Sequence, residues 1–355
     1  MSANAETQRI PALDGWRAIS ILLVIIGHLV NYRYQSGPPS PIAAYLSVMG
    51  VKVFFVISGL LIAGLALKEE ATTGTLSMKG FYRRRVYRIL PAYFAYLATV
   101  LVFSLLGWIQ QDAAGIGLAA VFVCNAPGLD CGWFVGHSWS LAYEEQFYLV
   151  FPLLFVLVPR HVKPRLFAAI HAFLAATPLL SLLLMPDTPE WAAYRVLASH
   201  FCCISAGVML AHHRETLARL ARHHALVSAA ALVVVAGCIA VTSGHFGHLP
   251  YHLRNAIETL VLPVSIAWLV FRTTVHRGAV TAFLDWAPLR YIGKISFSLY
   301  LWQQIFTAAP ATVTFSVLWL LPVAMFSYHF IEQPMVRLGR ARSHPPELLR
   351  QSLAR

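Results

Sequence analysis

The chain has 355 residues, of which 58% are hydrophobic and only 12% are charged. A soluble domain carries about 25% charged residues, so this composition excludes a soluble enzyme, a disordered chain and a fibrous repeat. The net charge of +12 comes from basic residues between apolar stretches, which indicates membrane topology and not nucleic-acid binding. The apolar stretches are continuous, which also excludes a β-barrel built from strands of alternating polarity.

We therefore predict an all-α fold, a polytopic bundle of ten transmembrane helices. Each apolar stretch is near the ~20 residues that a helix needs to cross a membrane. The ten predicted spans are 13–32, 45–67, 88–109, 138–158, 166–185, 195–211, 225–243, 255–272, 292–309 and 312–331.

The distribution of Lys and Arg predicts that both termini are cytoplasmic. In this orientation 23 of the 27 basic residues are cytoplasmic, and the other side holds only Arg33, Lys52, Arg195 and Arg254. The positive-inside rule predicts such an asymmetry. Residues 113–123 are apolar but about half the length of a span, so we expect a short or re-entrant element on the outer side.

The five cysteines fall into two groups. Cys202, Cys203 and Cys238 lie in predicted spans, where we expect inert buried thiols. Cys124 and Cys131 flank a loop on the predicted outer face, where the compartment is oxidising. Their spacing fits a disulfide and equally fits two unrelated free thiols.

Arg17 and His28 lie in the first predicted span, 11 residues apart. At 100° per residue this separation is about 20° from three full turns, so both side chains share one face of the helix. The axial separation is about 16 Å, which places Arg17 at the cytoplasmic edge and His28 near the middle of the bilayer. An ionisable group inside a span is a functional candidate. The alternative is a structural histidine bonded to a neighbouring helix.

Arg85 and Arg88 belong to the segment FYRRRVYR at 81–88, where the third span begins. Residues three apart share a helix face, and two arginines so placed can hold a phosphate group by bidentate contacts. The alternative is that the cluster only fixes the topology or binds anionic lipid.

Two carboxylates, Glu144 and Glu145, lie near the outer end of the fourth span. A carboxylate inside a membrane must pair with another group or line a polar cavity. Ser140, Glu144 and Tyr148 share one face at i, i+4 and i+8, whereas Glu145 lies about 100° away. The alternative is an interfacial cluster that stabilises two helix ends, with His137 as a cap or interface residue.

Two further polar residues are weaker candidates for the functional site, and the sequence offers no set of metal ligands. Ser58 lies in FFVISG at 54–59, which could equally serve helix packing. Glu332 ends the last span and could pair with a loop arginine. The histidine pairs at 212–213 and 223–224 lack a carboxylate or cysteine to complete a ligand set, so we predict no metal site.

Together these segments resemble the acyltransferase 3 family of integral membrane acyltransferases. The resemblance covers nearly the whole chain. Its motifs are Arg17-x10-His28, FFVISG at 54–59, Arg85-x-x-Arg88, SLAYEEQFY at 140–148, ISFSLYLW at 295–302 and IEQP at 331–334. The family moves acyl groups, commonly acetyl, from cytosolic acyl-CoA to hydroxyls, mostly on extracytoplasmic sugars of O-antigens, exopolysaccharides or peptidoglycan.

The resemblance implies that Arg17 and His28 match the family's essential pair, and that Arg85 and Arg88 match its second motif. We expect the three arginines to bind the phosphates of acyl-CoA, with acetyl-CoA as the expected donor, and His28 to act as the general base. Glu144 would then orient the acceptor or the imidazolium.

We assign the remaining candidates, Ser140, Glu145, Tyr148 and Ser58, to binding of a carbohydrate or other hydroxyl acceptor. Where the family often has Trp-His after SLYL, this chain has Trp302-Gln303, so no titrating role is assigned there.

We expect one membrane domain over residues 1–355, with its core at 10–335 and a basic cytoplasmic tail at 336–355, in the inner membrane of a bacterium. It would lack the fused hydrolase-like domain of longer family members, bind no nucleic acid, and have the lipid bilayer as its surroundings. The sequence does not define the oligomeric state.

The competing hypothesis is a proton-coupled transporter or flippase, since buried Arg, His and Glu suit a carrier as well. Carriers usually show internal repeats and broken helices, and the sequence shows neither. A membrane scaffold without chemistry is a third class.

Overall fold

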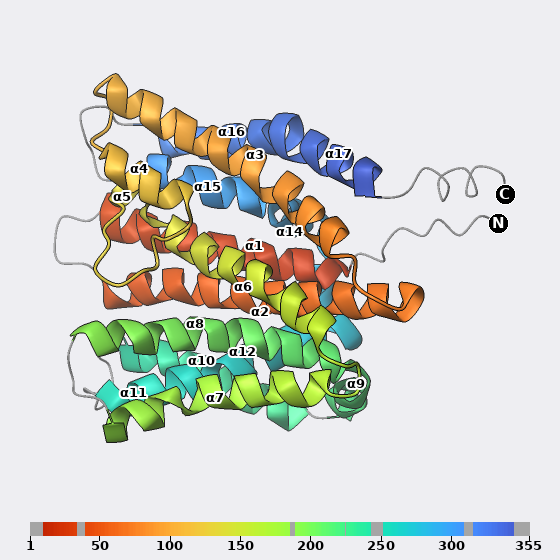
Figure 1. Ribbon diagram of the computed structural model, residues 1–355. Coiled ribbons are helices and arrows are strands. Elements are labelled where there is room, and N and C mark those ends of the chain that lie inside the picture. Colours follow the sequence, from red (N-terminus) through yellow and green to blue (C-terminus); the bar gives the residue numbers. More distant parts are fainter. Residues whose placement is uncertain are drawn as a thin grey trace, which may run out of the picture. The chain divides into compact units, whose positions relative to one another are not determined.

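The computed structural model describes residues 10–33, 40–184, 189–223, 225–242, 251–308 and 315–343. These residues form helices joined by turns and short loops and contain no strand, which confirms the predicted all-α fold (Figure 1). The elements in chain order are α1 (Pro11–His28), η1 (Leu29–Arg33), α2 (Pro41–Thr73), α3 (Met78–Leu105), α4 (Ala113–Ala120), α5 (Trp133–Gly136), α6 (Ser138–Leu157), α7 (Lys163–Leu184), α8 (Pro189–His212), α9 (Arg214–His223), α10 (Ala225–Thr242), α11 (Tyr251–Ala256), η2 (Ile257–Val261), α12 (Leu262–Val275), α13 (Ala279–Leu284), α14 (Ala287–Lys294), α15 (Ser296–Thr307), η3 (Val317–Trp319), α16 (Leu320–Phe326), η4 (Ser327–Glu332) and α17 (Gln333–Ser343). Of the η elements, η3 is a 3-10 helix and the other three are π-helices.

Five helical segments are long and apolar enough to cross a membrane, which supports an integral membrane protein. They are Pro11–Asn31, Pro41–Thr73, Met78–Leu105, Trp133–Leu157 and Leu253–Val275. Val196–His212 and Ala225–Val241 are shorter apolar helices. The count of ten spans and the cytoplasmic location of both termini, which lie outside the described residues, stay predictions.

The chain divides into two compact units, each made from separate stretches of sequence. Unit 1 contains Met1–Leu65 and Arg160–Ser296, and unit 2 contains Ala66–Pro159 and Phe297–Arg355. In unit 1, α8 packs against α7 and α12, and α10 packs against α12, so these helices lie side by side (Figure 1). In unit 2, α3 packs against η4 and α17.

In unit 1, α1 packs against both α13 and α14. Small residues let two membrane helices approach closely, and here α1 and α14 each supply a glycine. A Cβ atom at Gly15 of α1 would overlap the backbone of Leu284 at the end of α13, and one at Gly293 of α14 would overlap the carbonyl oxygen of Asp14. This packing fixes the N-terminal half of α1, where Arg17 begins the candidate site.

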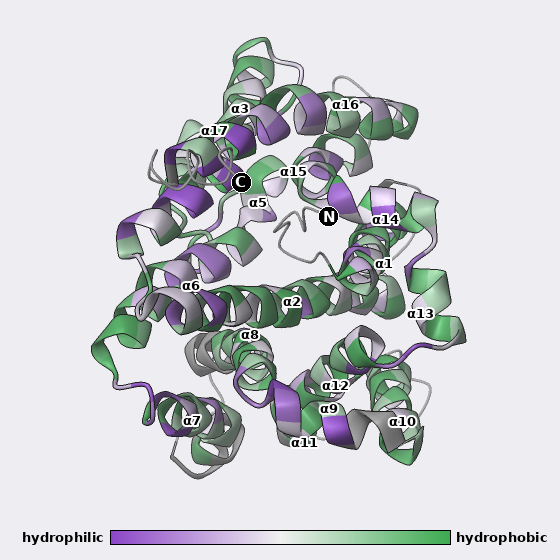
Figure 2. Cartoon of the chain, turned by 90° about the vertical axis from the view of Figure 1, so that its right-hand side faces the viewer, coloured by the Kyte–Doolittle hydropathy of each residue, from purple (hydrophilic) through white to green (hydrophobic). Residues whose placement is uncertain are grey.

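The long helix of unit 2, α3, has a defined start and a helical partner. The Ser77 hydroxyl accepts the backbone N–H of Gly80 at 3.1 Å, which caps the helix. Near this end, Arg342 of α17 donates to the Tyr87 hydroxyl at 2.5 Å, and Gly339 packs on the Tyr87 ring. Figure 2 shows hydrophilic residues on α17, whereas most helices are coloured as hydrophobic.

The segment between α3 and α6 contains α4, whose eight residues are too few to span a membrane. This agrees with the short element predicted at 113–123. The structure pairs Cys124 with Cys131, at a Cα–Cα distance of 5.9 Å, which decides between the two alternatives left by the sequence. Gln111 holds the segment by donating to the carbonyl oxygen of Cys131 at 2.7 Å. A disulfide forms in an oxidising compartment, so the pairing supports an outer location for this loop.

Candidate active site

Arg17 and His28 both lie on α1, which is one uninterrupted α-helix. The prediction that they share one face of a helix assumed such a helix. Both side chains are half-buried. His28 is the last residue of α1 and precedes the π-helix η1, so it lies nearer to the C-terminal end of the candidate span Pro11–Asn31 than to its middle. The expected position of His28 near the middle of the bilayer stays a prediction. π-Helical turns are frequent at functional sites.

Ser58 of α2 also belongs to unit 1 and is half-buried. Its neighbour Gly59 packs on α8, because a Cβ atom there would overlap the carbonyl oxygen of Ile204. Gly207 of α8 has the reciprocal relation with Val56 of α2. The small residue of FFVISG therefore serves helix packing, and a substrate role for Ser58 stays a prediction.

Arg85 and Arg88 lie in the first half of α3 in unit 2, and both are half-buried. The guanidinium carbon of Arg85 is 5.7 Å from the centroid of the Tyr148 ring, which is a cation–π distance. Among the described residues, its buried Nε atom has no hydrogen-bond partner. A buried N–H group needs an acceptor, so Arg85 retains a donor that an anionic ligand could use.

Four of the predicted residues lie on α6, in the same unit as Arg85. The Tyr148 hydroxyl donates to Glu144 Oε2 at 3.5 Å, as the i, i+4 spacing predicts. Glu145 interacts electrostatically with Arg85 and with Glu144. Its Oε1 atom is buried, with no hydrogen-bond partner in the described part of the chain. Unit 2 therefore brings together one cation, two carboxylates and Tyr148.

Ser140, on the same face of α6, has a partner that the sequence analysis did not find. Its hydroxyl lies 2.6 Å from the hydroxyl of Tyr300 on α15. Tyr300 in turn donates to the carbonyl oxygen of His137 at 2.6 Å. His137 is buried, and its ring packs against the rings of Tyr96 and Tyr300. His137 occupies the N-cap position of α6, as the sequence alternative expected, and its ring lies in a buried aromatic cluster without making a capping hydrogen bond.

Two further polar pairs lie on α15. Gln304 donates to the carbonyl oxygen of Trp133 at 2.9 Å, and Ser298 donates to Glu332 at 3.1 Å. The second contact gives Glu332 a partner on α15, and its pairing with a loop arginine stays a prediction. Tyr300, Ser298 and Trp302 all belong to ISFSLYLW, a motif that was noted in the sequence but given no residue roles.

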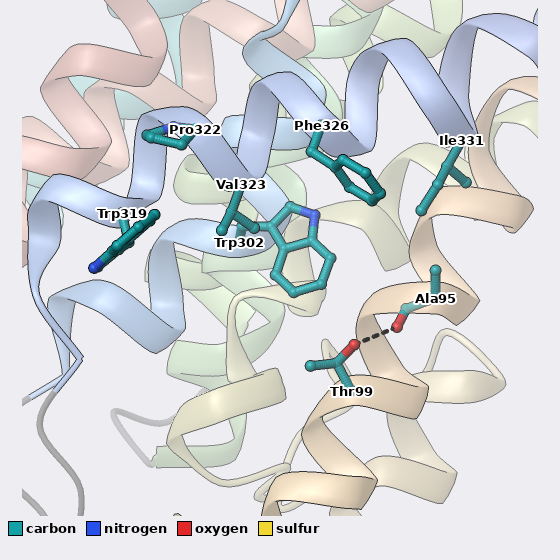
Figure 3. Close-up of a pocket in the computed structure, with 8 residues that line it drawn as sticks. All are labelled: Ala95, Thr99, Trp302, Trp319, Pro322, Val323, Phe326 and Ile331. Atoms are coloured by element: carbon teal, nitrogen blue, oxygen red, sulfur yellow. Dashed lines mark hydrogen bonds between the residues drawn. The ribbon is translucent and has the colours of Figure 1, made fainter.

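An apolar pocket of about 350 Å³ lies in unit 2 beside this cluster. Its walls come from α3, α15, η3, α16 and η4, and they include Thr99, Trp302 and Phe326 (Figure 3). The Thr99 hydroxyl is occupied within α3, because it donates to the carbonyl oxygen of Ala95 at 2.9 Å. The indole ring of Trp302 lies between α16 and α3. It also makes an edge contact with Tyr96, with ring centroids 5.5 Å apart.

Unit 1 contains a buried ion pair that the sequence analysis did not find. The side chain of Lys52, a residue expected on the outer side, is only 2% exposed within α2. Its ammonium lies 3.2 Å from Glu258 Oε2, in the π-helix η2. A lysine within an apolar run was itself a signal of an intramembrane site. In the described part of the chain, no group of three His, Cys, Asp or Glu residues could hold a metal ion.

The described residues thus carry two sets of ionisable groups inside apolar helices, which is the pattern of a membrane-embedded enzyme or carrier. The chain matches the acyltransferase domain of the Acyl_transf_3 family over residues 10–331, and it therefore belongs to that family. This confirms the resemblance drawn from the sequence motifs.

Curated relatives agree with this assignment. The peptidoglycan O-acetyltransferase OatA of Listeria monocytogenes is 26% identical over 93% of this chain and 56% of its own length. The putative peptidoglycan O-acetyltransferase YrhL of Bacillus subtilis is 28% identical over 93% of this chain and 55% of its own. The O-acetyltransferase OatA of Staphylococcus aureus is 28% identical over 93% and 58%. The chain spans little more than half the length of these relatives. No solved structure matches it.

Proposed function

We propose that the chain is a membrane O-acyltransferase that takes an acyl group, acetyl in the first instance, from cytosolic acyl-CoA. It would transfer this group to a hydroxyl of an extracytoplasmic carbohydrate. The observation that carries the proposal is the half-buried Arg85, with an unpartnered Nε donor, inside a membrane-length helix of a chain in this family. A buried guanidinium with spare donors suits an anionic ligand such as a phosphate.

In this proposal Arg17, Arg85 and Arg88 bind the phosphates of acyl-CoA. His28, about 16 Å along α1 from Arg17, removes the proton from the acceptor hydroxyl. The hydroxyl oxygen then forms a bond to the thioester carbonyl carbon. The carbon–sulfur bond breaks, and the CoA thiolate leaves with the electron pair and takes up a proton.

The acceptor would bind in contact with Ser58, Ser140, Glu145 and Tyr148. Glu144 would orient the acceptor, since a carboxylate accepts hydrogen bonds from sugar hydroxyls. The class of acceptor is a carbohydrate. The names of two relatives favour peptidoglycan, and O-antigen or exopolysaccharide are the other members of the class.

The second candidate is a proton-coupled carrier, and the Lys52–Glu258 pair favours it, since paired charges inside helices also mark ion pathways. Thermal unfolding of the purified protein in lipid nanodiscs separates the two. The enzyme proposal expects acetyl-CoA to raise the unfolding temperature, and sugars alone to leave it unchanged. Stabilisation by a sugar without any effect of acetyl-CoA would favour the carrier.

A further inference from the structure

One face of α3 carries both the paired arginines and one wall of the apolar pocket. Arg88 and Ala95 are seven residues apart, which is about 20° short of two full turns. Arg85 and Thr99 are 14 residues apart, about 40° short of four turns. The helix is continuous from Met78 to Leu105, so these four side chains form one stripe. Along it, the cations and the pocket wall are separated by about 10 to 20 Å.

The pocket is suited to hydrocarbon. The polar side-chain atoms of its lining residues are the indole nitrogens of Trp302 and Trp319 and the hydroxyl of Thr99, which is already bonded within α3. Trp319 and Phe326 line it from the opposite side, on η3 and α16 (Figure 3). Its volume of about 350 Å³ is far larger than a methyl group needs.

The indole ring of Trp302, which forms part of this wall, carries one unused polar atom. Its Nε1 atom is buried and has no hydrogen-bond partner among the described residues. Buried N–H groups are nearly always paired, so an acceptor oxygen from a ligand would complete the site. The carbonyl group of an acyl thioester offers such an acceptor oxygen, at the end of the hydrocarbon chain that is bonded to sulfur.

We propose that this pocket receives the hydrocarbon chain of the donor's acyl group, while Trp302 Nε1 donates to the thioester carbonyl oxygen. The inference rests on the proposed function, in which Arg85 and Arg88 hold the phosphates of acyl-CoA. Cations at one end of the stripe and an apolar pocket at the other match an elongated donor with phosphates at one end and an acyl chain at the other. The pocket would therefore accept chains longer than acetyl.

Equilibrium binding of acyl-CoA tests whether the pocket receives the acyl chain, and it does not require the acceptor to be known. Affinities of acetyl-, butanoyl-, hexanoyl- and octanoyl-CoA are measured on the purified protein in nanodiscs, with empty nanodiscs as the correction for partition into lipid. Burying one methylene contributes about 0.8 kcal/mol, so affinity is expected to rise up to about fourfold per methylene until the pocket is full.

Two variants narrow the pocket from opposite walls, Val323→Trp from α16 and Ala95→Leu from α3. Each is expected to abolish the dependence on chain length while acetyl-CoA binds within about twofold of the wild type. Leu321→Trp is the matched control on α16, because Leu321 is 44% exposed and does not line the pocket. Thermal unfolding identifies a variant that fails to fold. In that case the chain-length dependence of the other variant tests the inference.

The outcomes separate this inference from the proposed function. If no acyl-CoA binds, the donor assignment itself is wrong. If acetyl-CoA binds and longer chains bind equally well, the pocket holds only bilayer lipid and the inference is overturned. A chain-length dependence that persists unchanged in the two folded pocket variants would overturn it as well.

Discussion

The hydroxyl of Tyr300 lies 2.6 Å from the carbonyl oxygen of His137, and this bond joins α15 to the residue at which α6 begins. The same hydroxyl lies 2.6 Å from the hydroxyl of Ser140, one turn into α6. All three residues are buried. The contact therefore fixes the start of the helix that carries Glu144, Glu145 and Tyr148.

Removing this hydroxyl should loosen the start of α6. Tyr300→Phe removes the shortest of the hydrogen bonds to the buried carbonyl of His137, which then keeps only the longer contacts from the N–H and the hydroxyl of Ser140, at 3.3 and 3.5 Å. Loss of one such bond typically costs about 0.5–1.5 kcal/mol. Tyr82→Phe is the matched control, since the Tyr82 hydroxyl donates to the carbonyl oxygen of Leu149 at an exposed site. Thermal unfolding in nanodiscs should show a clear decrease for Tyr300→Phe and a small one for Tyr82→Phe. Equal decreases in unfolding temperature would show that the buried contact of Tyr300 stabilises the protein no more than the exposed contact of Tyr82.

The donor site can be tested through α3. Replacing Arg85 and Arg88 by Gln should weaken acetyl-CoA binding by at least tenfold, because charge-assisted bonds to phosphate are lost. Arg84→Gln is the control, since Arg84 forms a partly exposed ion pair with Glu69 at 2.7 Å. Unchanged binding in a correctly inserted double variant would assign the cluster to membrane topology or to anionic lipid.

The Lys52–Glu258 pair makes a prediction about stability. Lys52→Met leaves a carboxylate without its buried partner, and breaking a buried pair costs up to about 3–5 kcal/mol. Glu258 is 22% exposed, so water lowers this cost. The double variant Lys52→Met, Glu258→Leu should be more stable than Lys52→Met alone, because the uncompensated charge is gone. A double variant that unfolds at a lower temperature than Lys52→Met would contradict this account of the pair.

The topology can be tested with the loop that contains the disulfide. A reporter inserted after Gly128, between Cys124 and Cys131, should report the outer compartment, and a fusion after Arg165 should report cytoplasm. The basic asymmetry and the disulfide both motivate this expectation. A cytoplasmic signal after Gly128 would mean that residues 113–123 cross the membrane.

The helices were predictable because long apolar runs and their flanking charges are local features. The i, i+4 contact of Tyr148 with Glu144 is local in the same way. The partners of Lys52 and Ser140 were not predictable, since they lie 206 and 160 residues away in sequence. The disulfide was undecided for a related reason, because only the fold brings two Cα atoms to a bonding distance.

The central claim is that His28 is the base of an acyl transfer from acyl-CoA, and His28→Gln tests it most directly. Glutamine keeps some hydrogen bonding but cannot accept a proton at neutral pH. The measurement is transfer of labelled acetyl from acetyl-CoA to cell-wall glycan by the purified protein, with acetyl-CoA affinity measured on the same sample. The account predicts that turnover falls about 10²–10⁴-fold while the affinity stays within about twofold. Near-normal turnover of the Gln variant would contradict it and would move the search for the base to Glu144 or Glu145.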